Sequence, residues 1–418
     1  MEAHLRRAFI MITKQEAWTR IDLQLPDDIR NEIVYRPPYL VEGFFYSCWA
    51  SRDRLGEPTT VVTKLTPDGR AVEAFGDNGT VRIPMPGEWG DYFCFVVDGE
   101  HLLCGVALRS SDNFAIFRLN KASGAMDIDF GHQGYKIHPY PVEPDDTSEA
   151  AQPRLDGAEG YAGSVPQFPD GKLRQMVNSG LAQFDMQGNL DTSFNEVGMR
   201  RHFRWQGRAL QTLAVNARYR GTEHAGFHYC GDHRVGGDET QAWVGACDKN
   251  GAVLSGFAEQ GIWIVKRLPG HPDLAYIAVH ATTQAHDRLY LTGNAGTGTN
   301  QSGFVHCLKL DGTVDNRFND GQAIIFKRPE FERTIAFALT PHGSGVLVGC
   351  RAVSPIEDQM PIAIVRLDEN GHVDTAFGDQ GWLITPEYPE PYTLLTLTYE
   401  DQEIIELRGK EFIARHPL

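Results

Sequence analysis

A spaced motif recurs along this chain and constrains its fold more than any other feature. In six copies a glycine is followed six residues later by a phenylalanine. The glycines are Gly69, Gly124, Gly188, Gly251, Gly312 and Gly371, and the phenylalanines are Phe75, Phe130, Phe194, Phe257, Phe318 and Phe377. Successive glycines are 55 to 64 residues apart. A period of this size is typical of solenoids, propellers and other repeat arrays.

Between the motifs the sequence has the pattern of short β-strands. Apolar runs of four to seven residues alternate with turns rich in Gly, Pro, Asn and Asp, and no long helical periodicity appears. The second repeat predicts four strands, at residues 92–97, 102–107, 114–119 and 135–141. Four-stranded units repeated radially are the blades of a β-propeller.

The two ends of the chain determine the expected number of blades. Residues 391–415 supply three strands and then the chain stops, whereas residues 17–26 form a strand with nothing before it. Pairing these segments would complete one more blade and remove exposed sheet edges. We therefore predict an all-β, seven-bladed β-propeller of four-stranded blades, in which the N-terminal strand closes the last blade and residues 1–418 form one domain.

The motif residues have structural explanations. Asn-Gly and Asp-Gly pairs accommodate the positive φ that tight strand connections need. The phenylalanine is placed to fill the apolar gap between neighbouring blades. The third residue after the glycine is aspartate in four copies, Asp127, Asp191, Asp315 and Asp374, but Val72 and Leu254 replace it in the other two. An aspartate that valine or leucine can replace is not an obligatory ligand.

These copies resemble the Delta-60 repeat family, whose repeats have the form L-x-x-DG-x-x-D-x-x-F-G-x-x-G. The resemblance covers about residues 40–385, and the best copies lie at residues 308–321 and 365–381. The first and fourth copies lack the aspartate, and the fifth is one residue short. The resemblance implies a bacterial β-propeller and no established chemistry.

Function is expected on the propeller face that carries the long connections. The loops between the second and third strands of a blade, and those between blades, emerge together there, and long loops on a rigid scaffold commonly bind ligands. Aromatic and arginine side chains are the usual anchors; the candidates are Trp89, Arg109, Tyr140 and Trp205. The longest insert, residues 138–160, carries six acidic side chains against Arg154 alone. It is interpreted as a solvated loop or as an arm that recognises a partner.

The charge of the chain and its N-terminal sequence indicate which partners and which cellular compartment to expect. The chain has 39 Lys and Arg against 55 Asp and Glu, a net charge of −16. Phosphate binding requires clustered cations, and no basic stripe stands out, so no nucleic-acid partner is expected. The apolar run at residues 8–12 is too short for a secretory signal, and no membrane span is expected. We expect a cytoplasmic monomer.

The seven cysteines all fall inside predicted strands. Buried, reduced thiols explain them in a cytoplasmic protein, and an intermolecular disulfide or a reactive thiol is the alternative. The cysteines are Cys48, Cys94, Cys104, Cys230, Cys247, Cys307 and Cys350.

Two segments have the residue types of metal sites but not the pattern. His224, His228, Cys230 and His233 lie in one predicted strand, where alternation prevents all four from converging. Asp368, Asn370 and Asp374 resemble the start of a calcium loop, which also needs a bidentate glutamate further along. A turn is the preferred interpretation. We predict no metal site, cofactor or catalytic residues.

The sequence therefore favours a non-catalytic binding or scaffold propeller whose partner is another protein. Two alternatives stay open. A hydrolase or lyase acting on a carbohydrate could assemble carboxylates from several blades, which a linear scan does not reveal. A carbohydrate-binding module would use exposed Trp and Tyr side chains for stacking.

Overall fold

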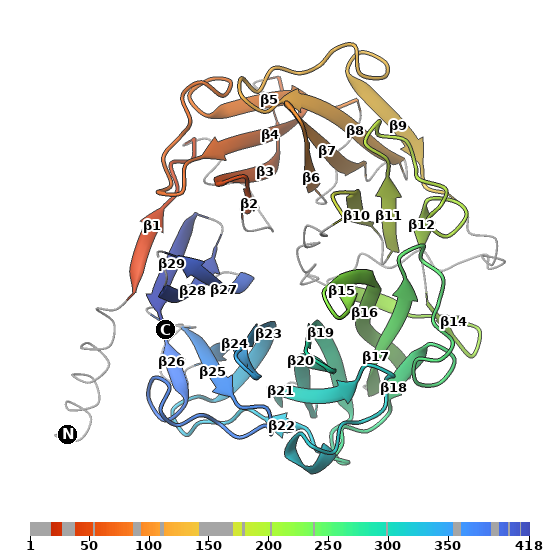
Figure 1. The fold of residues 1–418 in the computed structure, drawn as a ribbon, viewed down its shortest axis with the longest axis vertical. Helices are drawn as coiled ribbons and strands as arrows, with labels where there is room; N and C mark the ends of the chain where they lie inside the picture. The colour runs from red at the N-terminus through yellow and green to blue at the C-terminus, as the bar shows by residue number, and fades with distance from the viewer. Residues whose placement is uncertain are drawn as a thin grey trace. The chain divides into compact units, whose positions relative to one another are not determined.

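The structure is a computed structural model of the 418-residue chain. It describes residues 18–26, 38–52, 55–86, 93–108, 113–141, 170–177, 180–200, 203–236, 239–297, 300–353, 361–385, 393–399, 402–409 and 411–418. Within these residues there are 29 strands and one short 3-10 helix, η1 (Asn319–Gly321) (Figure 1). The described chain divides into an N-terminal unit, residues 23–233 and 242–264, and a C-terminal unit, residues 1–22, 234–241 and 265–418.

The N-terminal unit begins with two complete four-stranded antiparallel sheets. The first contains β2 (Tyr39–Val41), β3 (Phe44–Arg52), β4 (Pro58–Leu65) and β5 (Thr80–Pro84). The second contains β6 (Phe93–Asp98), β7 (His101–Leu108), β8 (Asn113–Asn120) and β9 (Tyr135–Pro139). The second sheet confirms the four strands predicted for that repeat.

The rest of the N-terminal unit contains a three-stranded sheet, a two-stranded hairpin and four longer strands. The three-stranded sheet contains β10 (Leu173–Val177), β11 (Gly180–Phe184) and β12 (Met199–Arg200). The hairpin contains β13 (Arg204–Trp205) and β14 (Arg208–Ala209). The longer strands, with most of their residues in this unit, are β15 (Gln211–Arg220), β16 (Glu223–Gly236), β17 (Glu239–Asp248) and β18 (Ile262–Val265).

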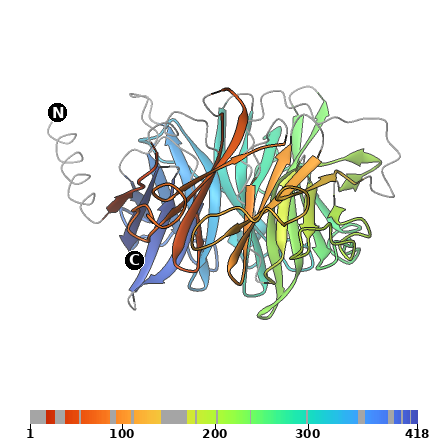
Figure 2. The same cartoon turned by 90° about the horizontal axis from the view of Figure 1, so that it is seen from above.

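The C-terminal unit contains three further groups of four strands. The first is β19 (Tyr276–Ala285), β20 (Arg288–Thr297), β21 (Asn300–Lys309) and β22 (Ile324–Ile325). The second is β23 (Arg333–His342), β24 (Gly345–Val353), β25 (Ile362–Leu367) and β26 (Trp382–Ile384). The third is β27 (Thr393–Tyr399), β28 (Gln402–Arg408), β29 (Phe412–Pro417) and β1 (Thr19–Asp22). Figure 2 shows the cartoon of Figure 1 turned by 90° about the horizontal axis.

Apolar side chains fill the space between successive sheets. One core joins Tyr46 and Val62 of the first sheet to Leu102 and Phe117 of the second, and Leu103 on the other face of β7 belongs to the next core. Both faces of such a strand are buried, so its sequence is a continuous apolar run instead of an alternating one. Four-stranded antiparallel sheets packed face to face are the blades of a β-propeller.

The prediction of seven separate four-stranded blades is wrong in its count, because five of the described sheets have four or more strands. One of these five has eight strands, since the single parallel pair Thr240 and Tyr276 joins β17 to β19. The sheet of β10 has three described strands, and residues 142–169 before it lie outside the described residues. Edge pairing between sheets depends on their packing and leaves no mark in a repeat pattern.

The first strand pairs with the last, as the chain ends predict. Strand β1 is antiparallel to β29, with Thr19 opposite Arg415 and Asp22 opposite Phe412, and the sheet order is β1-β29-β28-β27 (Figure 1). Beyond β1, Gln24 donates its backbone N–H to Gly69 O at 2.8 Å, and Gln24 Oε1 accepts from the Ala71 N–H. Trp18, Leu23 and Leu25 of this N-terminal arm are buried.

The repeat motif connects one blade to the next. All six of its phenylalanines are buried, as predicted. A Cβ added at Gly188 would lie 2.6 Å from Phe130 Cζ of the preceding copy, and one at Gly251 would lie 2.9 Å from Phe194 Cε2. The residue after the phenylalanine also bonds the next turn: Asn195 N–H donates to Asn250 O at 2.6 Å. Glycine is therefore required by both its positive φ and the contact with the previous phenylalanine.

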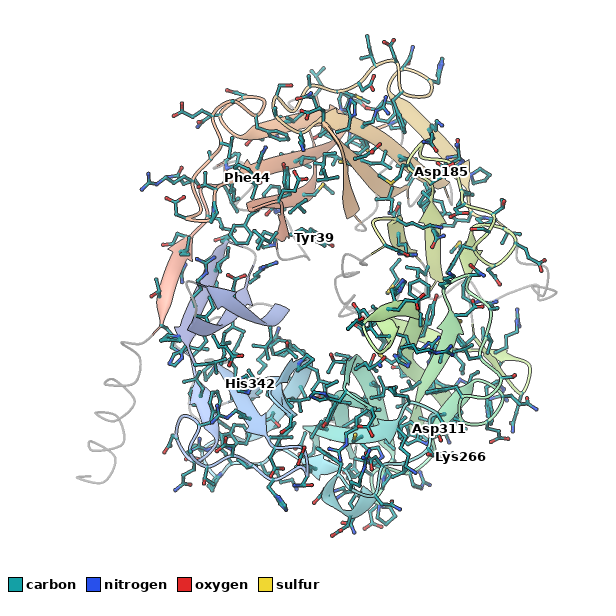
Figure 3. The ribbon with its side chains drawn as sticks, in the orientation of Figure 1. Tyr39, Phe44, Asp185, Lys266, Asp311 and His342 are labelled. Carbon is teal, nitrogen blue, oxygen red and sulfur yellow. The ribbon has the colours of Figure 1, made fainter. Side chains whose placement is uncertain are left out.

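Aspartates at the start of these turns cap the backbone. Asp185 and Asp311 (labelled in Figure 3) accept the N–H groups of Asn189 and Thr313 through Oδ1, at 2.8 and 2.9 Å. Asp368 accepts those of Asn370 and His372, both at 2.8 Å. This is the Asx-turn geometry that Asp and Asn favour, so the turn interpretation of residues 368–374 is confirmed.

Candidate binding hairpin and the polar framework around it

The four predicted site residues fall into three different settings. Trp89 and Arg109 lie outside the described residues. Tyr140 is half-buried and packs on Phe114, with ring centroids 4.5 Å apart. Trp205 packs against a different apolar cluster and stands on the hairpin of β13 and β14. Of the two candidates that the structure describes, Trp205 is the one on a hairpin.

The tight turn of the hairpin that carries Trp205 is explained by the residues at the turn. Gln206 and Gly207 both have positive φ, 50° and 79°, the values of a type I′ turn. Trp205 is directly opposite Arg208, and Arg204 is opposite Ala209. Directly opposed residues of an antiparallel pair project from the same face. Trp205 and Arg208 therefore form one face of the hairpin.

The base of the hairpin is anchored in the core. Phe203 and Leu210 are buried, and Leu210 N–H donates to Phe203 O at 2.8 Å. The centroid of the Phe203 ring lies 4.9 Å from that of Tyr229 and 5.1 Å from that of Trp243. A Cβ on Gly245 would approach Phe203 Cε1 to 2.6 Å, so glycine makes room for this ring. Trp205 and Arg208 therefore lie on a hairpin whose two ends are packed in the core.

The stretch of sequence that contains this hairpin is rich in arginine, a feature that the sequence analysis missed. Residues 200–234 contain seven arginines, no lysine, and only Glu223 and Asp232 as carboxylates. Arg208 is exposed. Burial, and then the positive charge of Arg208, lower the pKa of His233. Counting charge in short windows, instead of over the whole chain, would have revealed the segment.

The four repeat aspartates all form ion pairs with basic side chains. Asp127 pairs with Arg118, Asp191 with Lys172 at 2.6 Å, Asp315 with Arg288 at 2.9 Å and Asp374 with Arg366 at 2.7 Å. Where leucine replaces the aspartate, at Leu254, the equivalent of Arg366 is Ala246. These carboxylates therefore belong to the framework.

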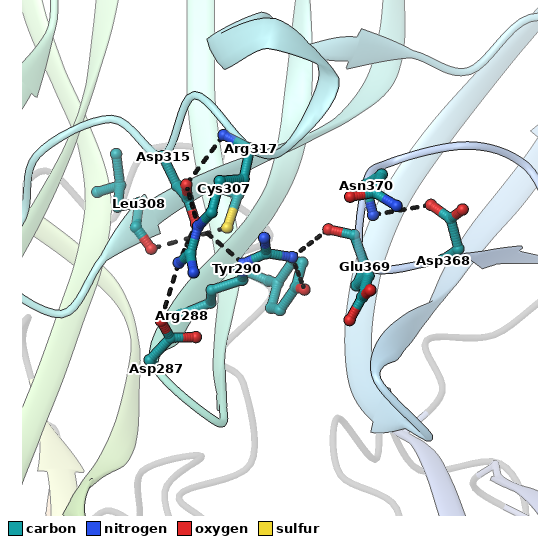
Figure 4. A network of polar contacts seen from close by, with 10 residues as sticks. All are labelled: Asp287, Arg288, Tyr290, Cys307, Leu308, Asp315, Arg317, Asp368, Glu369 and Asn370. Atoms are coloured by element: carbon teal, nitrogen blue, oxygen red, sulfur yellow. Dashed lines mark hydrogen bonds and ion pairs between the residues drawn. The ribbon is translucent and has the colours of Figure 1, made fainter.

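The most buried of these pairs is the centre of a larger network (Figure 4). The Asp315 side chain is 1% exposed and that of Arg288 is 9% exposed. Arg317 also donates to Asp315, at 2.7 Å, and bridges to Asp287 at 2.9 Å. Arg288 in turn donates to Glu369 O on the next blade. Hydrogen bonds from Arg317, aided by Arg288, lower the pKa of Asp315 to about 2.

A second network holds the one buried arginine of β10. Arg174 donates from Nη1 to Asp170 Oδ1 at 2.6 Å and from Nε to Gln183 Oε1 at 2.8 Å. His224 Nδ1 lies 3.4 Å from Asp170 Oδ2. Arg174 hydrogen bonds lower the pKa of Asp170 against the effect of burial. An acid held ionised in this way is a poor general acid or base near neutral pH.

The histidines of the candidate metal segment have separate surroundings. His224 is beside Asp170, His233 is near Arg208, and His228 is 1% exposed with its ring 6.0 Å from that of Phe257. Among the described residues no group of three His, Cys, Asp or Glu side chains is arranged to hold a metal ion. The six cysteines whose side chains are described are buried, and burial raises the pKa of Cys307 to about 12.

The buried His228 makes the free energy of unfolding depend on pH. Neither of its ring nitrogens has a hydrogen-bond partner among the described residues, and burial, with Arg218 nearby, lowers its pKa from 6.5 to about 3. The unfolded chain binds the proton first, so this contribution is present above pH ~6.5 and is lost as the pH falls. At pH ~5 the loss is about 2 kcal/mol, at ~1.4 kcal/mol per pH unit.

We therefore expect His228→Leu to reduce the destabilisation between pH ~7 and ~5 by about that amount. Denaturant unfolding at the two pH values measures it. His132→Leu, at an exposed histidine, is the control and should leave the pH dependence unchanged. An unchanged pH dependence in the His228 variant would show that the buried imidazole is not the acid-sensitive group.

Comparisons with known proteins found similar solved structures at low identity. No protein-family model and no curated protein matches the chain. Similar solved structures include the Saccharomyces cerevisiae core factor, with 10% identity, 96% of this chain and 56% of that chain covered, and a TM-score of 0.37. They also include the Nup133 β-propeller domain of Vanderwaltozyma polyspora, with 8% identity, 92% and 100% covered, and a TM-score of 0.36.

An α-L-arabinofuranosidase from Lactobacillus brevis is similar at 8% identity, with 79% of this chain and 91% of that chain covered and a TM-score of 0.34. This chain spans little more than half the length of the core-factor chain. At these identities and TM-scores the similarities assign no function. In the described part of the chain, no helix has the length and apolar character needed to cross a membrane.

Proposed function

We propose that this protein is a non-catalytic binding propeller of the Delta-60 repeat type that recognises another protein through its long connections. The observation that carries the proposal is the hairpin of β13 and β14, which presents Trp205 beside Arg208 on a base fixed in the core. Trp and Arg are the residue types most enriched at interface hot spots. A rigid presentation also lowers the entropy cost of association.

The polar framework supports a binding role over a catalytic one. The repeat aspartates and Asp170 are held by basic side chains, and the cysteine thiols are buried. These groups therefore stabilise the blades. Buried cysteines inside strands also support a reducing compartment, and we propose a bacterial cytoplasmic protein that acts as a monomer.

We expect Trp205→Ala to weaken binding of the native partner by about 2 kcal/mol or more, roughly a thirtyfold loss, because a hot-spot aromatic loses its desolvated contact. Co-purification of the full-length protein from its host, followed by mass spectrometry and binding measurements, provides the test. Ile128→Ala is the matched control, since Ile128 is 71% exposed but lies between β8 and β9, on a connection of the other kind.

Two results would overturn this proposal. One is a stoichiometric protein partner that binds the Trp205 and Ile128 variants with equal affinity. The other is the recovery of a small carbohydrate, instead of a protein, as the bound species. Melting curves of both variants establish that the blades are intact, because Trp205 also contributes to the packing of the hairpin base.

A further inference from the structure

The stretch of sequence that contains the hairpin has a charge opposite to that of the whole chain. The chain has a net charge of −16, yet residues 200–234 carry seven arginines against two carboxylates. An acidic surface repels acidic partners, and a local basic segment attracts them. A partner with carboxylates that contacts Arg208 therefore meets a cation, although the chain as a whole is acidic.

The two arginines of the hairpin differ in their availability. Arg204 is half-buried, and its Nη1 donates to Gly207 O at 3.5 Å, back onto the turn. Arg208 is exposed and shares its face of the hairpin with Trp205. Arg208 lies near enough to His233 to lower the pKa of that imidazole, after the larger effect of burial. Trp205 and Arg208 thus combine an apolar surface and a cation within one small area.

We infer that the partner of this hairpin presents an acidic segment, whose carboxylate bonds to Arg208 while a neighbouring apolar side chain packs on Trp205. The inference rests on the proposed function and specifies the chemistry of its partner. The planar guanidinium of arginine matches a carboxylate with two parallel hydrogen bonds. Trp205 beside it excludes water from that pair, which strengthens it.

The test uses the full-length protein and a fluorescein-labelled peptide composed of glutamate and phenylalanine. We expect the peptide to bind, and Arg208→Glu to weaken it by about tenfold or more, since a salt-bridged hot spot is replaced by a repulsive charge. Arg220→Glu is the matched control. It makes the same charge change at an exposed arginine at the far end of β15, and it should alter binding less than about twofold.

A lysine-phenylalanine peptide and oligothymidylate are the comparison probes. The inference is overturned if the glutamate peptide does not bind, if the Arg220 variant loses as much affinity as the Arg208 variant, or if oligothymidylate binds more tightly than the glutamate peptide. The last result would indicate a nucleic-acid surface. If the native partner depends on Trp205 but tolerates Arg208→Glu, the acidic-segment inference fails while the proposed function stands.

Discussion

Deletion of residues 1–26 is expected to abolish stable folding of the last sheet and to cause aggregation. The deletion removes β1, so the backbone of β29 becomes an exposed sheet edge. It also removes the buried Trp18, Leu23 and Leu25. Burial of each leucine is worth about 1.5–3 kcal/mol and loss of a buried tryptophan costs about 3–5 kcal/mol. The sum is comparable to the whole stability of a typical protein, about 5–15 kcal/mol.

Calorimetry and light scattering of the truncated protein measure this effect. Deletion of residues 1–16 is the control, because it leaves Trp18 and all of β1 in place. A protein lacking residues 1–26 that melts at the same temperature as the full-length chain, and stays monodisperse, would show that the pairing of β1 with β29 is dispensable.

Asp315→Leu is expected to destabilise the protein by about 3–5 kcal/mol, because it leaves the buried Arg288 guanidinium without its carboxylate. Asp374→Leu provides the matched comparison. Its ion pair with Arg366 is more exposed, with side-chain exposures of 35% and 23%. Exposed pairs contribute about 0–1 kcal/mol. Denaturant unfolding should therefore show a loss of unfolding free energy that is several times larger for Asp315→Leu than for Asp374→Leu.

The double variant Arg288→Met with Asp315→Leu distinguishes a buried charge from lost packing. Replacing both partners removes the unpaired charge, so the double variant should recover much of the lost stability. The fourth repeat already has Leu254 at the aspartate position. If the losses of unfolding free energy in the two single variants simply add up in the double variant, this account is wrong.

Because the pKa of Asp315 is lowered to about 2, the contribution of its carboxylate to stability is present above pH ~4 and is lost as the pH falls toward 2.

The strands and turns could be predicted because their causes are local. The glycines at positions 69, 124, 188, 251, 312 and 371 all have positive φ. Apolar runs such as residues 102–107 became strands buried on both faces. The pairing of the first strand with the last followed from counting strands at the two ends.

The candidate site could be predicted only in part. Trp205 was proposed from its residue type and stays a prediction, and Arg208 was not proposed, because a type I′ turn places it opposite Trp205. Tyr140 was predicted as a binding residue by the same reasoning and packs on Phe114. Tyr140 and Trp205 are both half-buried and packed on apolar clusters, and residue type alone does not indicate which of them contacts a partner.

The sequence by itself determined the repeat, the strand order and the buried phenylalanine of each copy, because a six-residue spacing acts over a short stretch of chain. Only the tertiary structure decided which cation neutralises each repeat aspartate. Asp374 pairs with Arg366, eight residues before it, whereas Asp315 pairs with Arg288 from another strand. It also decided that one pair, Thr240 with Tyr276, joins two groups of strands into one sheet. Such contacts depend on how strands distant in sequence pack, and no local pattern records that packing.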